Sequence, residues 1–240
     1  MAAAFVLVHG TGCGGWCWQF LAPILRAAGH AVYTPTLTGL GSSSHLSHEL
    51  KRISLDTHVK DITNLLFYED LSEKVVLVGH SYGGMVITEV AAKEPKRLAQ
   101  LVYFDAYLPL EGENEIELWP PEQKERYRTD LASGIKFRPP IPSSMLELTD
   151  PKMSKWVQER LTAHPYSTYE DAPASDTADG ASIPRTYIHC TIGPLSSWMK
   201  PFAARARKLG WNVQAMAKGH MVMITHPKEL AKILLQIANK

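Results

Sequence analysis

The sequence has little of three things, which are cysteine, net charge and long apolar runs. Its 240 residues include three cysteines and carry 25 Lys and Arg against 24 Asp and Glu, a formal net charge of +1. This balance gives no general attraction to phosphate backbones or acidic membrane surfaces, so we expect no nucleic-acid partner and no membrane partner. No run of about 18 apolar residues occurs, and we therefore expect no membrane-spanning helix.

The cysteines, Cys13, Cys17 and Cys190, are an odd number in a chain too large to need disulfide bonds for stability. We expect them to be reduced, buried thiols in a cytoplasmic protein. The apolar amino terminus has no basic region and no room for a cleavage site before His9, so it is interpreted as a first strand rather than a signal peptide.

Short β-rich runs alternate with helical patterns along most of the chain, which is long enough for one well-filled domain. We expect strands at residues 5–8, 31–34, 74–78, 101–104, 185–191 and 212–216, and helices at residues 18–28, 55–68, 81–92, 201–208 and 227–238. Such alternation predicts an α/β fold, with a mostly parallel sheet flanked by helices and functional groups at the carboxyl ends of the strands.

The character of the chain changes from about Leu110 to Ile183. This stretch is polar, is interrupted by the pairs Pro120-Pro121 and Pro139-Pro140, and shows helical patterns near residues 122–133 and 144–162. We interpret residues 110–183 as a helical cap inserted into a core made of residues 1–109 and 184–240.

The run Gly79-His80-Ser81-Tyr82-Gly83 lies between an apolar strand and a helical pattern. A Gly-x-Ser-x-Gly run in that context is typical of a nucleophile elbow, because the serine sits on a sharp turn where only glycine lets the backbone approach closely. Ser81 is therefore the predicted nucleophile.

An attacking serine needs two backbone donors for the oxyanion that forms on the substrate. The amide of Tyr82, at the start of the helix, is one candidate. The second is expected in the loop after the first strand, where Thr11 follows Gly10.

A serine hydroxyl also needs a base, and His220 follows the last expected strand. Most of the ten histidines are expected to be structural. His226 lies near the final helix, His80 fills the variable position of the elbow, and His9 braces the oxyanion loop.

The third member of a triad is less regular. Hydrolases with this order of elements most often carry the orienting Asp after the strand at residues 185–191, but no carboxylate occurs from Ile192 to Ser196. Asp105, at the end of the strand beside the elbow strand, keeps the chain order Ser-Asp-His, and we assign the acid to it. A structural Asp105, or Glu111, Glu113 or no acid at all, stays open.

With these residues in place the sequence resembles α/β-hydrolases of one group, which holds plant methyl esterases of the salicylic-acid-binding protein type, hydroxynitrile lyases and bacterial esterases including pyrethroid hydrolases. The resemblance runs nearly end to end through five segments, which are Phe-Val-Leu-Val-His-Gly, Gly-Gly-Trp-Cys-Trp, Gly-His-Ser-Tyr-Gly-Gly, Tyr-Phe-Asp-Ala-Tyr-Leu-Pro and Gly-His-Met-Val-Met-Ile-Thr-His-Pro. It implies an α/β-hydrolase fold with a cap.

Within this group the lyases resemble this chain but carry a Thr where Gly10 stands and a Lys where Met221 stands, so the resemblance favours an esterase. The plant members carry an Asp where this chain has Gly193, and the stretch Ile-Pro-Arg-Thr-Tyr-Ile-His-Cys is closer to the bacterial esterases.

The sequence thus predicts a serine carboxylesterase that acts on a hydrophobic small-molecule ester through an acyl-enzyme. The alternatives are a lyase and a ligand-binding homologue without turnover. Pocket-lining residues are expected among Gly10, Trp119, Trp198 and Met221, with plain packing as the other interpretation of each side chain, as it is for Trp16 and Leu118. No metal or cofactor is expected, and a homodimer stays open.

Overall fold

The computed structural model describes residues 2–72, 74–174 and 178–239, so residues 175–177 of the predicted cap lie outside the described part. Within it, six strands form the central sheet in the order β2-β1-β3-β4-β7-β8. They are β1 (Ala4–Val8), β2 (Ala31–Tyr33), β3 (Val75–His80), β4 (Leu98–Phe104), β7 (Arg185–Cys190) and β8 (Asn212–Met216). Each pairing is parallel, which confirms the predicted sheet.

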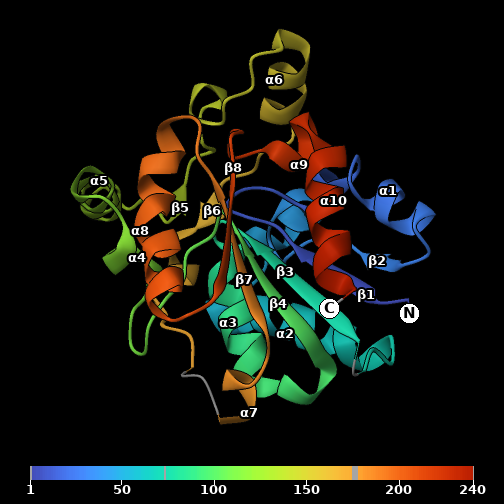
Figure 1. Ribbon diagram of the computed structural model, residues 1–240. Helices are drawn as coiled ribbons and strands as arrows, with labels where there is room; N and C mark the ends of the chain where they lie inside the picture. Colours follow the sequence, from blue (N-terminus) through green and yellow to red (C-terminus); the bar gives the residue numbers. More distant parts are fainter. Residues whose placement is uncertain (1, 73, 175–177, 240) are drawn as a thin grey trace.

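Helices cover both faces of this sheet (Figure 1). One face packs against α1 (Ala22–Ala27) and α10 (Pro227–Ala238). The other face packs against α2 (Leu55–Tyr68), α3 (Gly83–Lys93) and α8 (Pro194–Lys208). The chain reverses its direction across the sheet between β1 and β3, and in open α/β sheets ligands bind outside the carboxyl ends of the strands at such a point.

Alternate residues of β1 supply the two apolar layers. Phe5 and Leu7 belong to the layer with α1 and α10, and Val6 and Val8 belong to the layer with α2, α3 and α8. All four side chains are fully buried. This explains why the strand is a continuous apolar run, since a parallel sheet covered on both faces has no solvent side.

Local capping sets several helix ends. Helix α2 begins after Ser54, whose side chain accepts a hydrogen bond from the Thr57 amide while the Thr57 hydroxyl accepts from the Ser54 amide. This reciprocal cap fixes the predicted start of the helix. All three cysteines are free and buried, as expected.

Three helix predictions were wrong in extent. The helix expected at residues 18–28 is α1, which begins only at Ala22. The helix expected at residues 144–162 is only α6 (Pro151–Gln158), because Asp150 caps its start and Pro151 occupies the first turn. The helix expected from Pro201 begins instead at Pro194, and Pro201 lies inside α8.

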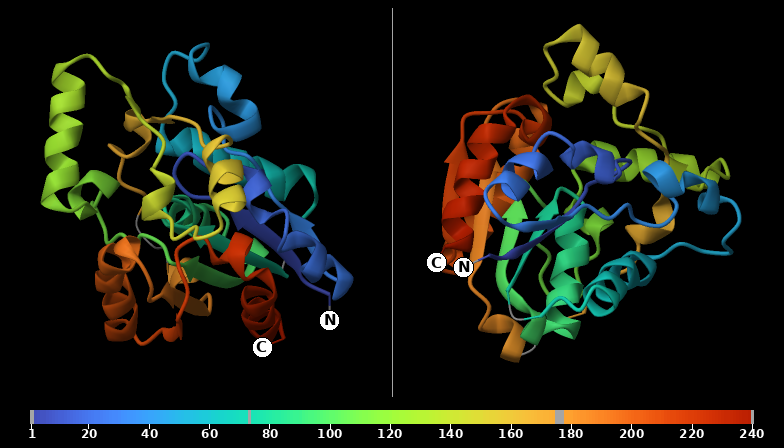
Figure 2. Two further views of the ribbon diagram at one scale, coloured as in Figure 1. Left: turned by 90° about the horizontal axis from the view of Figure 1, so that it is seen from above. Right: turned by 90° about the vertical axis from the view of Figure 1, so that its right-hand side faces the viewer.

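The segment between β4 and β7 carries α4 (Glu115–Leu118), α5 (Pro121–Ala132), α6 and α7 (Ala178–Ala181). It is not purely helical, because β5 (Phe137–Arg138) and β6 (His164–Pro165) pair as a small antiparallel sheet. In Figure 2 the yellow part of this segment lies over the sheet in the left view and at the top of the molecule in the right view, and the lime helix α5 lies at the left edge of the left view. The short helix α9 (Val222–Thr225) follows β8.

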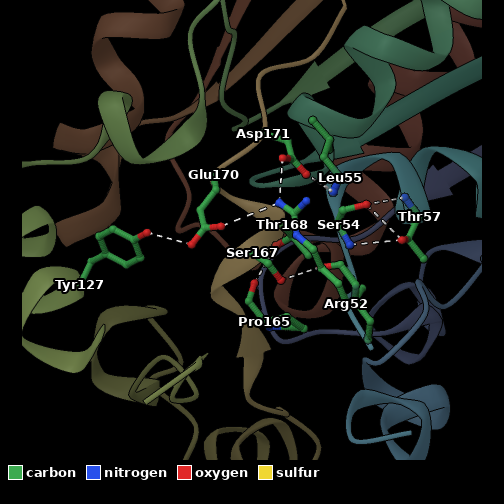
Figure 3. Close-up of polar contacts among 11 residues, drawn as sticks. Arg52, Ser54, Leu55, Thr57, Tyr127, Pro165, Ser167, Thr168, Glu170 and Asp171 are labelled. Carbon is green, nitrogen blue, oxygen red and sulfur yellow. Dashed lines mark hydrogen bonds and ion pairs between the residues drawn. The ribbon is translucent and has the colours of Figure 1, made fainter. Parts of the chain in front are cut away.

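A cluster of polar contacts connects this segment to the core near the start of α2 (Figure 3). Arg52 forms ion pairs with Glu170 and Asp171, at 3.8 Å and 2.9 Å, and Asp171 also accepts from the Leu55 amide. Ser167 donates to a main-chain carbonyl of the core at 2.6 Å.

Among the described residues, no helix combines the length and the apolar character needed to cross a membrane.

Candidate active site

Ser81 stands directly after β3 with a left-handed backbone, at φ 54°. This conformation is uncommon for a residue other than glycine and is often found at functional sites. The turn closes only because its neighbours are small. A Cβ at Gly79 would lie 2.5 Å from the carbonyl oxygen of Gly83, and a Cβ at Gly83 would lie 2.8 Å from that of Val8. The structure therefore has the sharp turn that the sequence pattern predicts.

Asp105 follows the neighbouring strand β4 and reaches His220, which follows β8. The Nδ1 atom of His220 donates to Oδ2 of Asp105 at 2.7 Å. Both side chains are almost fully buried. A carboxylate at Nδ1 fixes the proton there, which leaves Nε2 of His220 free to accept a proton.

The other oxygen of Asp105 is also held. Oδ1 accepts from the Cys190 amide at 2.9 Å and from Nδ1 of His189 at 3.2 Å. Burial alone would raise the pKa of Asp105, but the hydrogen bonds from His189 and His220 hold it below its usual value. Asp105 is thus a buried carboxylate that stays ionised.

The other candidate acids lie elsewhere. Glu113 forms an ion pair with Arg205, whose Nη2 lies 3.1 Å from Oε1. Glu111 is exposed. Of the carboxylates considered from the sequence, the structure brings Asp105 to His220.

Gly193 stands where related sequences carry the orienting Asp. It faces the side chain of Glu147, which lies between β4 and β7. A Cβ at Gly193 would lie 2.6 Å from Cδ and Oε1 of Glu147, and φ at Gly193 is 90°. Glu147 itself has φ 56°. The space next to Gly193 is therefore filled by Glu147, and there is no room there for a second orienting acid.

Two histidines that the sequence did not assign to the site support it. The ring of His80 lies 4.3 Å from that of His220, centroid to centroid, and its Nε2 donates to the main-chain oxygen of His220 at 3.0 Å. Burial holds the pKa of His80 well below its usual value, so its ring is neutral. His80 thus holds the main chain at His220, while His189 holds Asp105. In the sequence, the only signals for these roles were the position of His80 next to Ser81 and the position of His189 near the end of β7.

Two further histidines considered from the sequence lie outside the triad. His9 accepts from the Leu37 amide at 3.1 Å, and burial lowers the pKa of His9 to about 4. It therefore braces the loop after β1, as expected. His226 is exposed at the start of α10.

The two predicted oxyanion donors are unoccupied main-chain groups. Across the residues that the structure describes, the amides of Thr11 and Tyr82 donate to no other protein group. Gly10 brings this loop close to the nucleophile, since a Cβ at Gly10 would lie 2.7 Å from Cβ of Ser81. Two free donors beside a nucleophile suit a developing oxyanion.

Ser81 and His220 line one narrow pocket of about 10 Å³, the space of a single water molecule. Gly10, Thr11 and Met221 share its wall with three apolar residues between β4 and β7, which are Ile141, Leu146 and Leu161. The Ser81 hydroxyl makes no hydrogen bond to His220 among the described contacts. Such contacts often tighten only when substrate binds.

Of the expected pocket residues, Gly10 and Met221 line the pocket around Ser81, and Trp198 lines a neighbouring pocket. Trp119 lines neither of these pockets. It is buried, its indole N–H donates to Glu115 at 3.0 Å, and its ring packs against Tyr169. Packing therefore accounts for Trp119, and the same holds for Trp16, which packs against Trp156.

Comparison with known proteins decides the family. Residues 5–233 match the model of the alpha/beta hydrolase family. The chain belongs to the alpha/beta hydrolase family. A carbendazim hydrolyzing esterase of Nocardioides sp. (strain SG-4G) is 37% identical over 97% of this chain and 98% of its own length. Salicylic acid-binding protein 2 of Nicotiana tabacum is 30% identical over 98% of this chain and 97% of its own length.

The fold of this alpha/beta hydrolase is shared with a solved extracellular alpha/beta-hydrolase from a Paenibacillus species. The TM-score is 0.81 at 24% identity, over 98% of each chain. The full-length relatives bear out the prediction of an enzyme that hydrolyses carboxylic esters, and the bacterial esterase is more similar to the chain than the plant protein.

Proposed function

We propose that this alpha/beta hydrolase is a serine carboxylesterase with the triad Ser81, His220 and Asp105. Nε2 of His220 takes the hydroxyl proton of Ser81 as Oγ attacks the ester carbonyl carbon. The amides of Thr11 and Tyr82 hold the oxyanion, and His220 then returns the proton to the departing alcohol. Water, activated by the same histidine, attacks the acyl-enzyme and releases the carboxylic acid, which restores Ser81.

The contact of 2.7 Å between Asp105 and His220 carries this proposal. It sets the tautomer that a general base requires, and it lies at the same edge of the sheet as the elbow. The two unoccupied amides supply the electrostatic part, worth about 3 kcal/mol for each donor.

The apolar wall of the pocket supports a hydrophobic ester as substrate. Ile141, Leu146, Leu161 and Met221 line the pocket that contains Ser81 and His220, and this pocket is too small for an ester as it stands. The three residues between β4 and β7 must therefore move outward when substrate enters. The bacterial relative is named for carbendazim hydrolysis, and its being an esterase supports ester hydrolysis by this chain.

A lyase is less well supported. Gly10 leaves no room for a side chain in contact with Ser81, and the residue after His220 is the buried, uncharged Met221. The case for a ligand-binding homologue rested on the missing carboxylate at Gly193, and Asp105 supplies a carboxylate to His220 from another strand.

The proposal is tested by comparing hydrolysis of 4-nitrophenyl acetate with cyanide release from mandelonitrile. We expect hydrolysis by the parent protein, a loss of at least about 10³-fold in kcat for Ser81→Ala and for His220→Ala, and no cyanide release. His226→Ala, an exposed histidine of the same region, is the matched control and should keep full activity. Cyanide release without hydrolysis, or full activity of Ser81→Ala, would overturn the proposal.

A further inference from the structure

A second pocket adjoins the one around Ser81. It has a volume of about 180 Å³, and Ile141 lines both. Its apolar wall contains Met145, Leu195 and Trp198, together with three prolines, and its polar wall contains Gln123, Arg126 and Arg138. Ligand sites of whole small molecules usually occupy about 300–1,000 Å³, so this pocket suits one end of a substrate whose ester lies at Ser81.

Arg138, on β5, is a buried cation in this second pocket. Only 8% of the surface of Arg138 is exposed to solvent. Its guanidinium lies 4.7 Å from the ring centroid of Trp119 and donates one hydrogen bond, to Oε1 of Gln123 at 3.1 Å. It forms no ion pair with a carboxylate among the described residues. This is unusual, because buried arginines are almost always paired with an anion.

The nearby buried carboxyl group does not supply that anion. Glu115 accepts from Trp119 through Oε1, and its Oε2 has no hydrogen-bond partner within the described part of the chain. Burial raises the pKa of Glu115 to about 8, so this group is mostly protonated at neutral pH. Arg138 therefore keeps most of its unpaired donors and its charge available to the pocket.

Arg126 adds a second positive charge to the same wall. Its Nε lies 3.7 Å from Oδ2 of Asp130, and its side chain is half exposed. Among the residues with a described position, no acidic one lines the pocket. The pocket thus combines a buried planar cation with apolar walls of proline, leucine and tryptophan.

We propose that Arg138 binds a carboxylate carried by the substrate, so that the preferred substrates are amphipathic esters with an ionised carboxyl group beyond the scissile bond. The planar guanidinium matches a carboxylate with two parallel hydrogen bonds, and the bound anion supplies the missing countercharge. The apolar walls contact the carbon chain or ring between the two groups. This proposal rests on the esterase site at Ser81 and specifies its substrate class.

The test uses pairs of esters that differ in charge but hardly in shape. On the acyl side, the 4-nitrophenyl monoester of glutaric acid is compared with 4-nitrophenyl 5-methylhexanoate. On the alcohol side, 4-acetoxybenzoate is compared with 4-isopropylphenyl acetate. We expect a preference of about 10- to 100-fold in kcat/KM for the charged member of at least one pair, the size of a charge-assisted hydrogen bond.

The preference must depend on Arg138. Arg138→Met should abolish it, and Arg138→Lys should keep part of it. Arg128→Gln is the matched control, because Arg128 is exposed on α5 and does not line the pocket. If Arg138→Met does not fold, inhibition of the parent enzyme by benzoate and by benzamide decides the point, with benzoate expected to bind at least tenfold more tightly.

Equal kcat/KM within both ester pairs would overturn the carboxylate proposal while leaving the esterase intact. A preference that survives Arg138→Met would also overturn it. Failure of the esterase proposal has a different signature, since then none of the four esters would be hydrolysed in a manner dependent on Ser81.

Discussion

Replacing Asp105 by Asn should block catalysis through the tautomer of His220. The amide of Asn has one oxygen and one NH₂ group where Asp105 has two acceptors. The Cys190 amide can only donate, at 2.9 Å, and so requires the oxygen on its side. The NH₂ group then faces Nδ1 of His220, which must accept instead of donate, and the proton moves to Nε2. His220 can no longer take a proton from Ser81.

The cost follows from these contacts. The opposite orientation of Asn would place its NH₂ against the buried Cys190 amide and would leave donors unpaired, at about 1–3 kcal/mol. A base held in the wrong tautomer lowers kcat by about 10⁴-fold, equivalent to about 5.5 kcal/mol of transition-state stabilisation. The fold should persist, because Asn has the size of Asp and keeps one of its acceptors.

Steady-state hydrolysis of 4-nitrophenyl acetate, with thermal unfolding of the same samples, measures both effects. Asp61→Asn is the matched control, because Asp61 also accepts from a main-chain amide, that of Thr38 at 2.7 Å, but lies on α2 outside the pocket. We expect it to keep kcat within about threefold. Asp105→Asn with kcat within tenfold of the parent, in a folded protein, would refute the assignment of the acid.

Two further predictions concern stability. Burial raises the pKa of Glu115 in the folded protein from its usual 4.5 to about 8. Its contribution to stability is therefore fully present below pH 4.5 and is lost as pH rises from there to about 8. Glu115→Gln should therefore raise the free energy of urea unfolding by about 3 kcal/mol at pH 8 and by little at pH 5, and an equal change at both would contradict the buried acid. Gly193→Asp should lower the free energy of unfolding by about 2–4 kcal/mol, because Asp at this position must adopt a left-handed backbone and its side chain overlaps Glu147. In thermal unfolding, adding Glu147→Gly should recover part of this loss. Unchanged stability of Gly193→Asp alone would contradict the overlap.

The sequence was sufficient for the features that depend on local pattern. The elbow at Ser81 could be predicted because strand, glycine turn and helix are consecutive in the chain. The bounds of α2 followed from its helical periodicity. The parallel sheet followed from the alternation of strands and helices, whose connections leave few arrangements.

Contacts between distant segments could be predicted only in part. Asp105 was identified because its strand neighbours the elbow strand, but its contacts with His189 and Cys190 depend on the pairing of β4 with β7. The pocket-wall residues Ile141, Leu146 and Leu161 lie on irregular chain before and after α6, where composition gives no register. The charge of Arg138 is informative only once the structure shows it buried and without an anionic partner.

The central claim is that Ser81 is the nucleophile of an esterase, and covalent labelling tests it most directly. The parent protein is treated with a fluorophosphonate, digested, and mapped by peptide mass spectrometry. We predict one phosphonyl group on the peptide that contains Ser81, with labelling slowed by orders of magnitude in His220→Ala and absent in Ser81→Ala. Labelling at another residue, or no labelling of a protein that hydrolyses 4-nitrophenyl acetate, would contradict this account.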